Sequence, residues 1–354
     1  MMYERLTNRI KSVDTKIWQM IAEIRELKGE WKGKEKLGTQ VLGRLKKSVL
    51  ATSTGSSTRI EGARMSDEDV EKLMKGLKMI RFSERDRGEV RGYYEALKIV
   101  FQHYKELPFT ENTIRYLHGE LLKYTEKDQR HRGSYKRGEN RVDMLDEHGQ
   151  AIATIFNPTA AFLTPKEMQE LAAWGEEMLR DTSQDPLPII ASIILEFLSI
   201  HPFQDGNGRM SRLLTNLLLL RAGYAFMPYT SHEKLIEDNK GEYYIALRRS
   251  QKERKSQGEN ALPWFEFFFS VLLKQSRFAI ELLSEEKTEN LLSELQVKVL
   301  EYIRFSKDAS PREITAHTGI GRPTRNQILK RLLVLNFIEQ YGRGRSTRYR
   351  VAKK

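Results

Sequence analysis

Hydrophobic positions recur along this chain at the spacing of an α-helix. Leu73, Leu77 and Ile80 lie three or four residues apart, and most of the chain shows the same interval. This spacing gathers apolar side chains on one face of a helix. The pattern therefore predicts a mainly α fold, with one long helix over residues 3–30 and a linker rich in Lys and Gly over residues 28–38.

Local signals place several helix ends. Ser66 precedes three acids within four residues, which favours Ser66 as the N-cap of a helix. Pro165 suits the first turn of another helix. An apolar helix is expected over residues 187–200, and a further one over residues 207–220 that stops at Gly223.

One region departs from the helical period. Residues 141–145 and 151–156 form two short runs that flank the sequence DEHGQ. This arrangement predicts a β-hairpin with its turn near His148 and Gly149. Helices then resume and continue to about Leu283.

The last part of the chain, residues 295–354, has a pattern of its own. Helices are expected over residues 296–305, from Ser310 onward, and over residues 323–335. Two alternating runs around the turn GRGRS follow the last helix. This order of elements predicts a helix-turn-helix with a β-wing.

Length and composition narrow the class of protein. A chain of 354 residues with 39% apolar residues favours two or three domains with real cores. No uncharged apolar run approaches the roughly 20 residues that span a bilayer, so no membrane partner is expected. The first residues lack the apolar core of a secretory signal, and the chain has no Cys. We therefore expect a cytoplasmic protein.

The net charge of +12 is concentrated at one end. Residues 290–354 hold fourteen Lys and Arg against five acids, a balance of +9. Clustered positive charge is typical of surfaces that meet DNA phosphates. The alternative is a protein-interaction module with a solvated basic face. The candidate contacts are Arg322, Arg325, Lys330 and Arg331 on the predicted recognition helix, and Arg343, Arg345, Arg348 and Arg350 on the wing.

The stretch HPFQDGNGRMSR, residues 201–212, combines groups suited to phosphate chemistry. Gly206 and Gly208 let the backbone approach a ligand, and the helix that follows directs its positive end toward an anion. Arg209 and Arg212 share one helix face and offer forked donors to phosphate oxygens. For any one of these residues taken alone, a solvated turn between two helices is the favoured interpretation.

Two further groups in this stretch have chemical roles to offer. Asp205 is placed for Mg²⁺, which proteins bind through one or two carboxylates. A histidine ordinarily titrates near neutral pH, so His201 is expected to be the general base.

As a whole, the stretch resembles the signature of the Fic family, H-P-F-x-[DE]-G-N-G-R-x-x-R, at every defined position. The resemblance extends over roughly residues 88–268. It implies a Fic helical bundle with a β-hairpin flap, to which the C-terminal winged helix-turn-helix is added. It also implies Mg²⁺-dependent transfer of AMP from ATP to a Ser, Thr or Tyr hydroxyl of a protein, this chain included.

The resemblance assigns roles to residues of the loop. His201 would deprotonate the target hydroxyl, and Asp205 would hold Mg²⁺ between the α- and β-phosphates. The remaining loop residues would bind phosphate oxygens of ATP, and these are Gly206, Asn207, Gly208, Arg209 and Arg212. The intact glycine pair favours AMP over other transferred groups.

Two more elements follow from the same resemblance. Residues 137–157 would form the flap that pairs with a target segment, although this stretch is longer than the common flap. Tyr243 and Tyr244 would wall the ribose and adenine. An equally favoured interpretation makes each tyrosine part of the helical core.

A second motif opposes the first. The sequence STRIEG, from Ser57 to Gly62, matches the pattern [ST]-x-x-x-E-[GN] that marks an inhibitory helix in one class of the family. Glu61 would pair with Arg212 and occupy the place that the γ-phosphate needs. The same Glu61 could instead orient a water that removes AMP from a modified protein. The plain alternative is a Glu beside a glycine that ends a helix.

The sequence thus predicts four regions. They are an N-terminal helical region over residues 1–87 with an inhibitory helix at about 54–64, a catalytic core over 88–283, a linker over 284–294, and a winged helix over 295–354. A homodimer and DNA are further candidate partners. The competing function is a DNA-binding regulator whose Fic core senses nucleotide without turnover.

Overall fold

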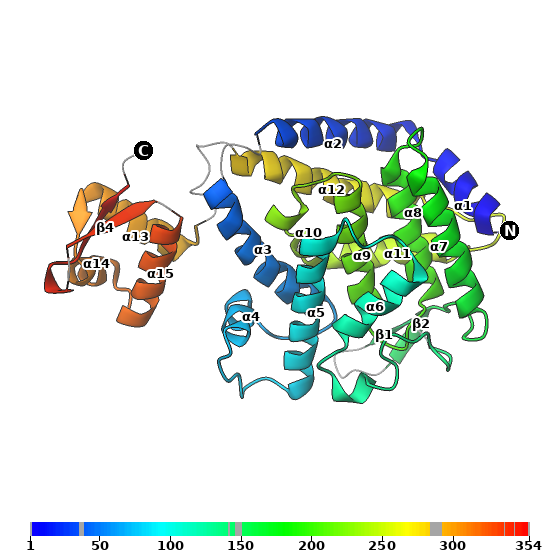
Figure 1. The fold of residues 1–354 in the computed structure, drawn as a ribbon, viewed down its shortest axis with the longest axis horizontal. Coiled ribbons are helices and arrows are strands. Elements are labelled where there is room, and N and C mark those ends of the chain that lie inside the picture. The colour runs from blue at the N-terminus through cyan, green and yellow to red at the C-terminus, as the bar shows by residue number, and fades with distance from the viewer. Residues whose placement is uncertain are drawn as a thin grey trace. The chain divides into compact units, whose positions relative to one another are not determined.

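A computed structural model describes residues 2–34, 39–140, 142–145, 151–283, 292–335, 337–342 and 344–352. The fold is mainly helical, as the apolar spacing predicted (Figure 1). Contacts divide it into two compact units, Met1–Gly33 with Lys46–Ala279, and Lys34–Leu45 with Ile280–Lys354. Among the described residues, no helix is both long and apolar enough to cross a membrane.

The N-terminal region forms three helices. These are α1 (Met2–Lys11), α2 (Thr15–Lys34) and α3 (Thr39–Ile60). The prediction of one helix over residues 3–30 is wrong, because the Asp14 side chain accepts the Ile17 N–H at 2.8 Å and starts a new helix. The prediction of a linker from residue 28 is also wrong as far as Lys34, because these residues belong to α2. Trp31 holds this part of the helix in place, since it is buried against Phe226 and Tyr229.

The central helices of the first unit are strongly apolar. Every residue of α8 (Pro186–Ile200) after Pro186 is buried, and α8 packs between α7 (Thr164–Arg180) and α9 (Asn207–Arg221). Helices α5 (Glu84–His103) and α6 (Glu111–Leu121) cover α9 (Figure 1). Helices α4 (Asp67–Met74), α10 (His232–Asp238), α11 (Lys240–Gln251) and α12 (Leu262–Leu283) complete this unit.

Most predicted boundaries in this unit agree with the structure. Ser66 caps α4 with a capping box, and Pro165 lies in the first turn of α7. Gly223 follows α9 with a φ of 86°. The predicted hairpin is present as β1 (Val142–Leu145) and β2 (Ala151–Phe156), an antiparallel pair. Its turn at His148 and Gly149 lies outside the described residues.

A buried ion cluster fixes α1 to the core. Glu196 on α8 is fully buried and receives Arg5 at 2.6 Å, Arg9 at 2.9 Å and Arg254 at 2.7 Å. Burial alone would raise the pKa of Glu196, but Arg254, Arg9 and Arg5 hold that pKa well below its usual range. Since Glu196 lies one turn before the end of α8, the cluster ties the N-terminus to the helix that leads into the loop at residues 201–206.

The C-terminal unit follows the predicted order of elements. It contains α13 (Glu294–Phe305), α14 (Pro311–Thr318) and α15 (Arg322–Val334), followed by β4 (Ile338–Tyr341) and β5 (Arg348–Val351). A short strand that the sequence did not predict, β3 (Asp308–Ala309), joins them in an antiparallel sheet of order β3-β5-β4. The core of this unit includes Val299, Leu300, Ile314 and Leu329. Most of the predicted linker, residues 284–291, lies outside the described residues.

Candidate active site

The loop between α8 and α9 begins and ends with left-handed residues. His201 terminates α8 with φ 52° and ψ 60°, and Gly206 precedes α9 with a φ of 82°. A left-handed conformation is strained for a residue with a side chain, and such strain is held by surrounding structure. Here the His201 N–H donates to the Phe197 carbonyl at 2.9 Å. The surrounding structure therefore holds His201 in a left-handed conformation at the end of α8.

His201 is held in its neutral form. Burial, together with the nearby Lys136 cation, lowers the pKa of His201 to about 4 against the opposing charges of Glu61 and Asp205. Its Nδ1 is buried and has no hydrogen-bond partner among the described residues. A neutral imidazole with a free ring nitrogen can accept a proton at neutral pH.

Asn207 holds the loop closed. Its Oδ1 accepts the Phe203 N–H at 2.9 Å, and its Nδ2 donates to the Phe203 carbonyl at 2.7 Å. The side chain of Asn207 is therefore fully engaged within the protein. What Gly206, Asn207 and Gly208 can offer a ligand is their backbone at the positive end of α9.

Arg209 and Arg212 are buried, and each has a guanidinium nitrogen that makes no hydrogen bond to the described residues. Arg209 donates to Asp205 at 3.2 Å and lies 3.3 Å from Glu89. The Glu89 contact is an ion pair of Arg209 Nη1. Nε of Arg209 and Nη1 of Arg212 are buried and have no hydrogen-bond partner among the described residues. Buried donors are normally satisfied, and guanidinium groups match phosphate oxygens in geometry and charge. The arrangement therefore suits an anionic ligand with several oxygens.

Asp205 is ionised beside these arginines. Burial raises the pKa of Asp205, but the Arg209 guanidinium and the Gly206 N–H together hold it below its usual value. Among the described residues, no group of three or more His, Asp or Glu is arranged to hold a metal ion. One ionised carboxylate fits Mg²⁺ that is shared with the phosphates of a nucleotide, since Mg²⁺ binds through few protein ligands and keeps several waters.

Glu61 forms an ion pair with Arg212. Glu61 Oε1 is 2.7 Å from Arg212 Nη2, and Arg212 also donates from Nε to Ser57 Oγ at 2.8 Å and from Nη2 to the Ser57 carbonyl at 3.0 Å. A Cβ on Gly208 would approach Glu61 Oε1 to 2.3 Å. The carboxylate thus lies directly over the backbone at the start of α9.

The segment that carries Ser57 and Glu61 differs from the predicted helix over residues 54–64. Helix α3 ends at Ile60, and Glu61 stands in the turn after it, because Gly62 adopts a φ of 103° that ends the helix. Toward its N-terminus the helix is longer than predicted. Arg59 anchors its end through Glu237 at 2.6 Å and Asp67 at 3.0 Å.

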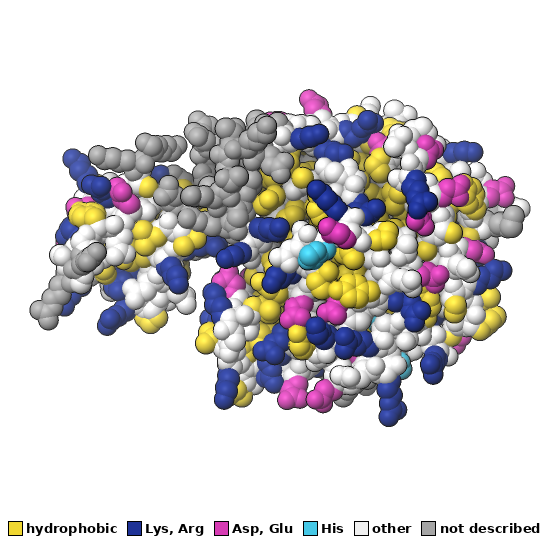
Figure 2. All heavy atoms as spheres, viewed as in Figure 1, with side chains coloured by type: hydrophobic (Ala, Val, Ile, Leu, Met, Phe, Trp, Pro, Cys, Tyr) yellow, Lys and Arg dark blue, Asp and Glu magenta, His cyan; other side chains and the backbone are white. Residues whose placement is uncertain are grey.

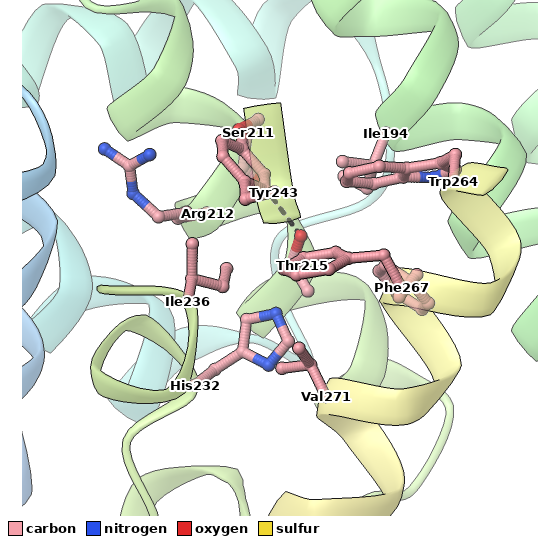
Figure 3. Close-up of a pocket in the computed structure, with 11 residues that line it drawn as sticks. Ile194, Ser211, Arg212, Thr215, His232, Ile236, Tyr243, Trp264, Phe267 and Val271 are labelled. Atoms are coloured by element: carbon pink, nitrogen blue, oxygen red, sulfur yellow. Dashed lines mark hydrogen bonds between the residues drawn. The ribbon is translucent and has the colours of Figure 1, made fainter. Parts of the chain in front are cut away.

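The two candidate tyrosines contact each other, with ring centroids 5.2 Å apart, but differ in burial. Tyr243 is 3% exposed and packs on Trp264 and Phe267, whereas Tyr244 is partly exposed. Behind Arg212 and Tyr243 lies a cavity of about 10 Å³ that Thr215 and His232 also line (Figure 3). Such a volume holds at most one water. Tyr243 therefore belongs to the aromatic core in this structure, and Tyr244 is the more exposed of the two.

The sequence analysis missed His118 on α6. Its ring stacks on Phe203 with centroids 3.6 Å apart, Nδ1 accepts the Gly133 N–H at 3.0 Å, and Nε2 lies 3.1 Å from the Asp205 carbonyl. Burial lowers the pKa of His118 to about 4, so that the neutral ring donates from Nε2 to Asp205. His118 occupies an apolar position of its helix, and that position gave no sign of this role.

Lys136 and Asn140 were also missed. Lys136 donates from Nζ to the Ile200 carbonyl at 3.3 Å and to Asn140 Oδ1 at 2.7 Å, and Asn140 donates to the Phe203 carbonyl at 3.0 Å. Burial lowers the pKa of Lys136 to about 8. Both residues precede the hairpin, and only the fold brings them beneath the loop.

Comparison with known proteins agrees with this geometry. Residues 108–219 match the Fic/DOC family, a range that includes the loop and most of α9. This part of the chain is thus similar to a Fic domain. It is 38% identical over 76 residues to a Fido domain-containing protein of Dictyostelium discoideum, covering 20% of this chain and 53% of that protein. It is 34% identical over 101 residues to the protein adenylyltransferase fic-1 of Caenorhabditis briggsae, covering 28% of this chain and 18% of that one.

Solved structures extend the likeness beyond the Fic domain. A Fic family protein from Desulfovibrio desulfuricans G20 is 25% identical with a TM-score of 0.64, and the match covers 97% of this chain and 98% of that one. A Fic-1 fragment from C. elegans is 19% identical with a TM-score of 0.58, covering 75% and 72% of the two chains, which shows a shared fold. The two Caenorhabditis fic-1 relatives are named protein adenylyltransferases, and the match spans 18% of the length of each.

Proposed function

We propose that this protein transfers AMP from ATP to a hydroxyl group of a protein, and that Glu61 restrains this activity. The observation that carries the proposal is that two buried guanidinium donors, Nε of Arg209 and Nη1 of Arg212, have no partner among the described residues, on the helix that follows a neutral His201. Phosphoryl-type transfer depends on positioning and on charge neutralisation, and this site offers both.

In this proposal each residue of the loop has a defined role in the reaction. The target hydroxyl attacks the α-phosphorus of ATP while the His201 imidazole accepts its proton. The bond from the α-phosphorus to the bridging oxygen breaks, and pyrophosphate leaves. Arg209 and Arg212 bind the β- and γ-phosphate oxygens, and the backbone at Gly206 and Gly208 binds the phosphates at the helix end.

Asp205 would hold Mg²⁺ in this reaction. The ion neutralises charge on the phosphates when it is bound. Asp205 is ionised and partly exposed, with its Arg209 contact at 3.2 Å and its Arg85 contact at 3.4 Å. These contacts are long enough for the carboxylate to exchange one of them for a cation.

The flap over residues 137–157 would present the target. Strands β1 and β2 form a two-stranded antiparallel sheet, so each strand has an edge on which a target segment can pair. Such pairing uses main-chain groups and admits many sequences, this chain among them.

Glu61 would lower the activity by holding Arg212. Its carboxylate lies 2.7 Å from Arg212 Nη2, where a phosphate oxygen would otherwise bind. The same carboxylate is 32% exposed and could instead activate a water for removal of AMP.

The experiment uses ATP labelled at the α-phosphate, with ATP labelled at the γ-phosphate as the matched control. Parent, Glu61→Gly and His201→Ala proteins are incubated with each label, Mg²⁺ and cell lysate. AMP transfer labels protein only from the α position, and only where His201 is intact. If Glu61→Gly labels no protein from the α position, the proposal is wrong, and a core that senses nucleotide without turnover takes its place.

A further inference from the structure

Helix α15 of the C-terminal unit presents a face that the proposed activity does not use. Its inner face, with Ile328, Leu329 and Leu332, is buried in the core of the unit. No Asp or Glu occurs on the helix. The exposed residues at its start and along its outer face are Arg322, Pro323, Thr324, Asn326, Gln327 and Lys330.

The helix is rigidly mounted on α14. Gly319 ends α14 with a φ of 71°, and Ile320 is buried in the turn between the two helices. Arg325 donates from Nη1 to the Pro311 carbonyl at 2.9 Å and to Thr315 Oγ1 at 2.7 Å. Arg325 is 7% exposed, so the expectation that it lies on a surface for DNA is wrong, and it joins the two helices instead.

The charge of this unit is unevenly compensated. Arg348 pairs with Asp308 at 2.6 Å and Glu313 at 3.2 Å, and Arg350 pairs with Glu339 at 2.6 Å. The strand that carries two of the predicted wing arginines is thus largely neutralised. Arg343 lies outside the described residues, as does the side chain of Arg345.

By contrast, Arg322 and Lys330 have no acidic partner among the described residues, and both are exposed. Dark-blue Lys and Arg side chains spread over the visible face of this unit, with few acids among them (Figure 2). The uncompensated charge of the described residues therefore includes both ends of the exposed stretch of α15.

We propose that the C-terminal unit binds double-stranded DNA with α15 in the major groove. Arg322 and Lys330 are eight residues apart, which is about 12 Å along a helix. The major groove is about 12 Å wide and admits an α-helix, so Arg322 in the first turn and Lys330 about two turns later can each meet a phosphate at the edge of the groove. Between them, Gln327 offers an amide to the base edges, where Gln pairs with adenine in two hydrogen bonds.

The same features disfavour other occupants of this face. Double-stranded RNA has a deep, narrow major groove that a helix cannot read. A protein partner would require an apolar centre for the contact. The exposed face between Arg322 and Lys330 carries Thr324, Asn326 and Gln327, with Pro323 as its only apolar residue.

The test measures binding of the full chain to a labelled 24-base-pair duplex by fluorescence anisotropy between 50 and 200 mM KCl. The parent should bind more weakly as salt rises. The Arg322→Ala/Lys330→Ala variant should lower the slope of log K against log salt by about 1.8, at roughly 0.9 for each lost phosphate contact. The matched control is Lys16→Ala/Lys166→Ala, two exposed lysines of the first unit that change the net charge equally.

Three results would overturn the proposal: no duplex binding at 50 mM KCl, equal slopes for the two double variants, or equal binding of an RNA duplex. Gln327→Ala provides a second readout that general charge does not affect. On a sequence selected by the parent, it should lose about tenfold in affinity at one base pair while binding to unrelated DNA is unchanged. Since these residues lie outside the Fic domain, AMP transfer by all variants should equal that of the parent, whether or not DNA binds.

Discussion

Replacing Glu61 by Gly tests the restraint on the candidate active site most directly. The change removes the carboxylate 2.7 Å from Arg212 Nη2 and adds no new group. Arg212 keeps both of its bonds to Ser57, at 2.8 and 3.0 Å, and therefore keeps its position. What changes is that one guanidinium nitrogen becomes available to a phosphate oxygen.

The size of the effect follows from that contact. A hydrogen bond between charged groups contributes about 1.5–3 kcal/mol. Because the Glu61 side chain is 32% exposed and water screens it, we take the lower part of this range, about 1.5–2 kcal/mol. Each 1.4 kcal/mol changes a rate or an equilibrium constant by a factor of about ten, so the rate of AMP transfer should rise about ten- to thirtyfold.

The assay is the initial rate of label transfer from α-labelled ATP at several ATP concentrations. Glu61→Gln is the matched control, since it keeps the size of the side chain and loses its charge, and its rate should fall between those of parent and Glu61→Gly. The double variant Glu61→Gly/Arg212→Ala should lose the gain, because the freed guanidinium is gone. A Glu61→Gly rate equal to that of the parent would refute the reasoning.

Three further expectations rest on buried charges. The pKa of His201 is about 4, so kcat/KM for AMP transfer should stay level from pH 8 to pH 5.5, and a fall centred on pH 6.5 would contradict this value. Because the pKa values of His118 and His201 are lowered in the folded protein, the unfolded chain binds more protons than the folded one below about pH 6.5. The free energy of unfolding in urea should therefore fall toward pH 4. At pH 5 the loss relative to neutral pH should be about 2 kcal/mol for each imidazole. Arg9→Ala leaves the buried Glu196 short of one partner and should cost about 3 kcal/mol in the same urea assay, where no loss would show that the cluster adds nothing.

His118 merits a test of position as well as stability. His118→Leu keeps a bulky side chain in this buried position but removes the hydrogen bonds to Gly133 and to the Asp205 carbonyl. Loss of the loop geometry should lower kcat for AMP transfer more than it raises KM for ATP, and His118→Asn should restore part of the rate. Equal effects of the two substitutions would indicate a role in packing alone.

Local signals predicted the elements that depend on local physics. The capping box at Ser66, the first-turn Pro165 and the stop at Gly223 each act within a few residues, and each is present in the structure. Predictions failed where a distant contact decided the outcome. Trp31 extends α2 because it is buried on residues almost 200 positions away, and no local pattern contains that information.

The candidate site divides in the same way. The loop residues could be found because glycine, acid and arginine stand at fixed spacing in twelve positions of sequence. His118, Lys136 and Asn140 act on the loop through carbonyl groups, and any side chain with a donor in the right place can do this. Their residue types carry no signature, and only the fold identifies them.

Helix α3 has two opposite effects on Arg212, and this limits how the proposed restraint can be relieved. Ser57 on α3 positions the guanidinium through both its hydroxyl and its carbonyl, while Glu61 just beyond the helix end occupies it. Withdrawing the helix would remove Glu61 but would also break both bonds from Arg212 to Ser57 and release the guanidinium from its position. Glu61, in contrast, lies in a turn next to Gly62 and is partly exposed. Under the proposed restraint, activation would therefore need Glu61 to rotate away from Arg212 while Ser57 keeps the guanidinium in place.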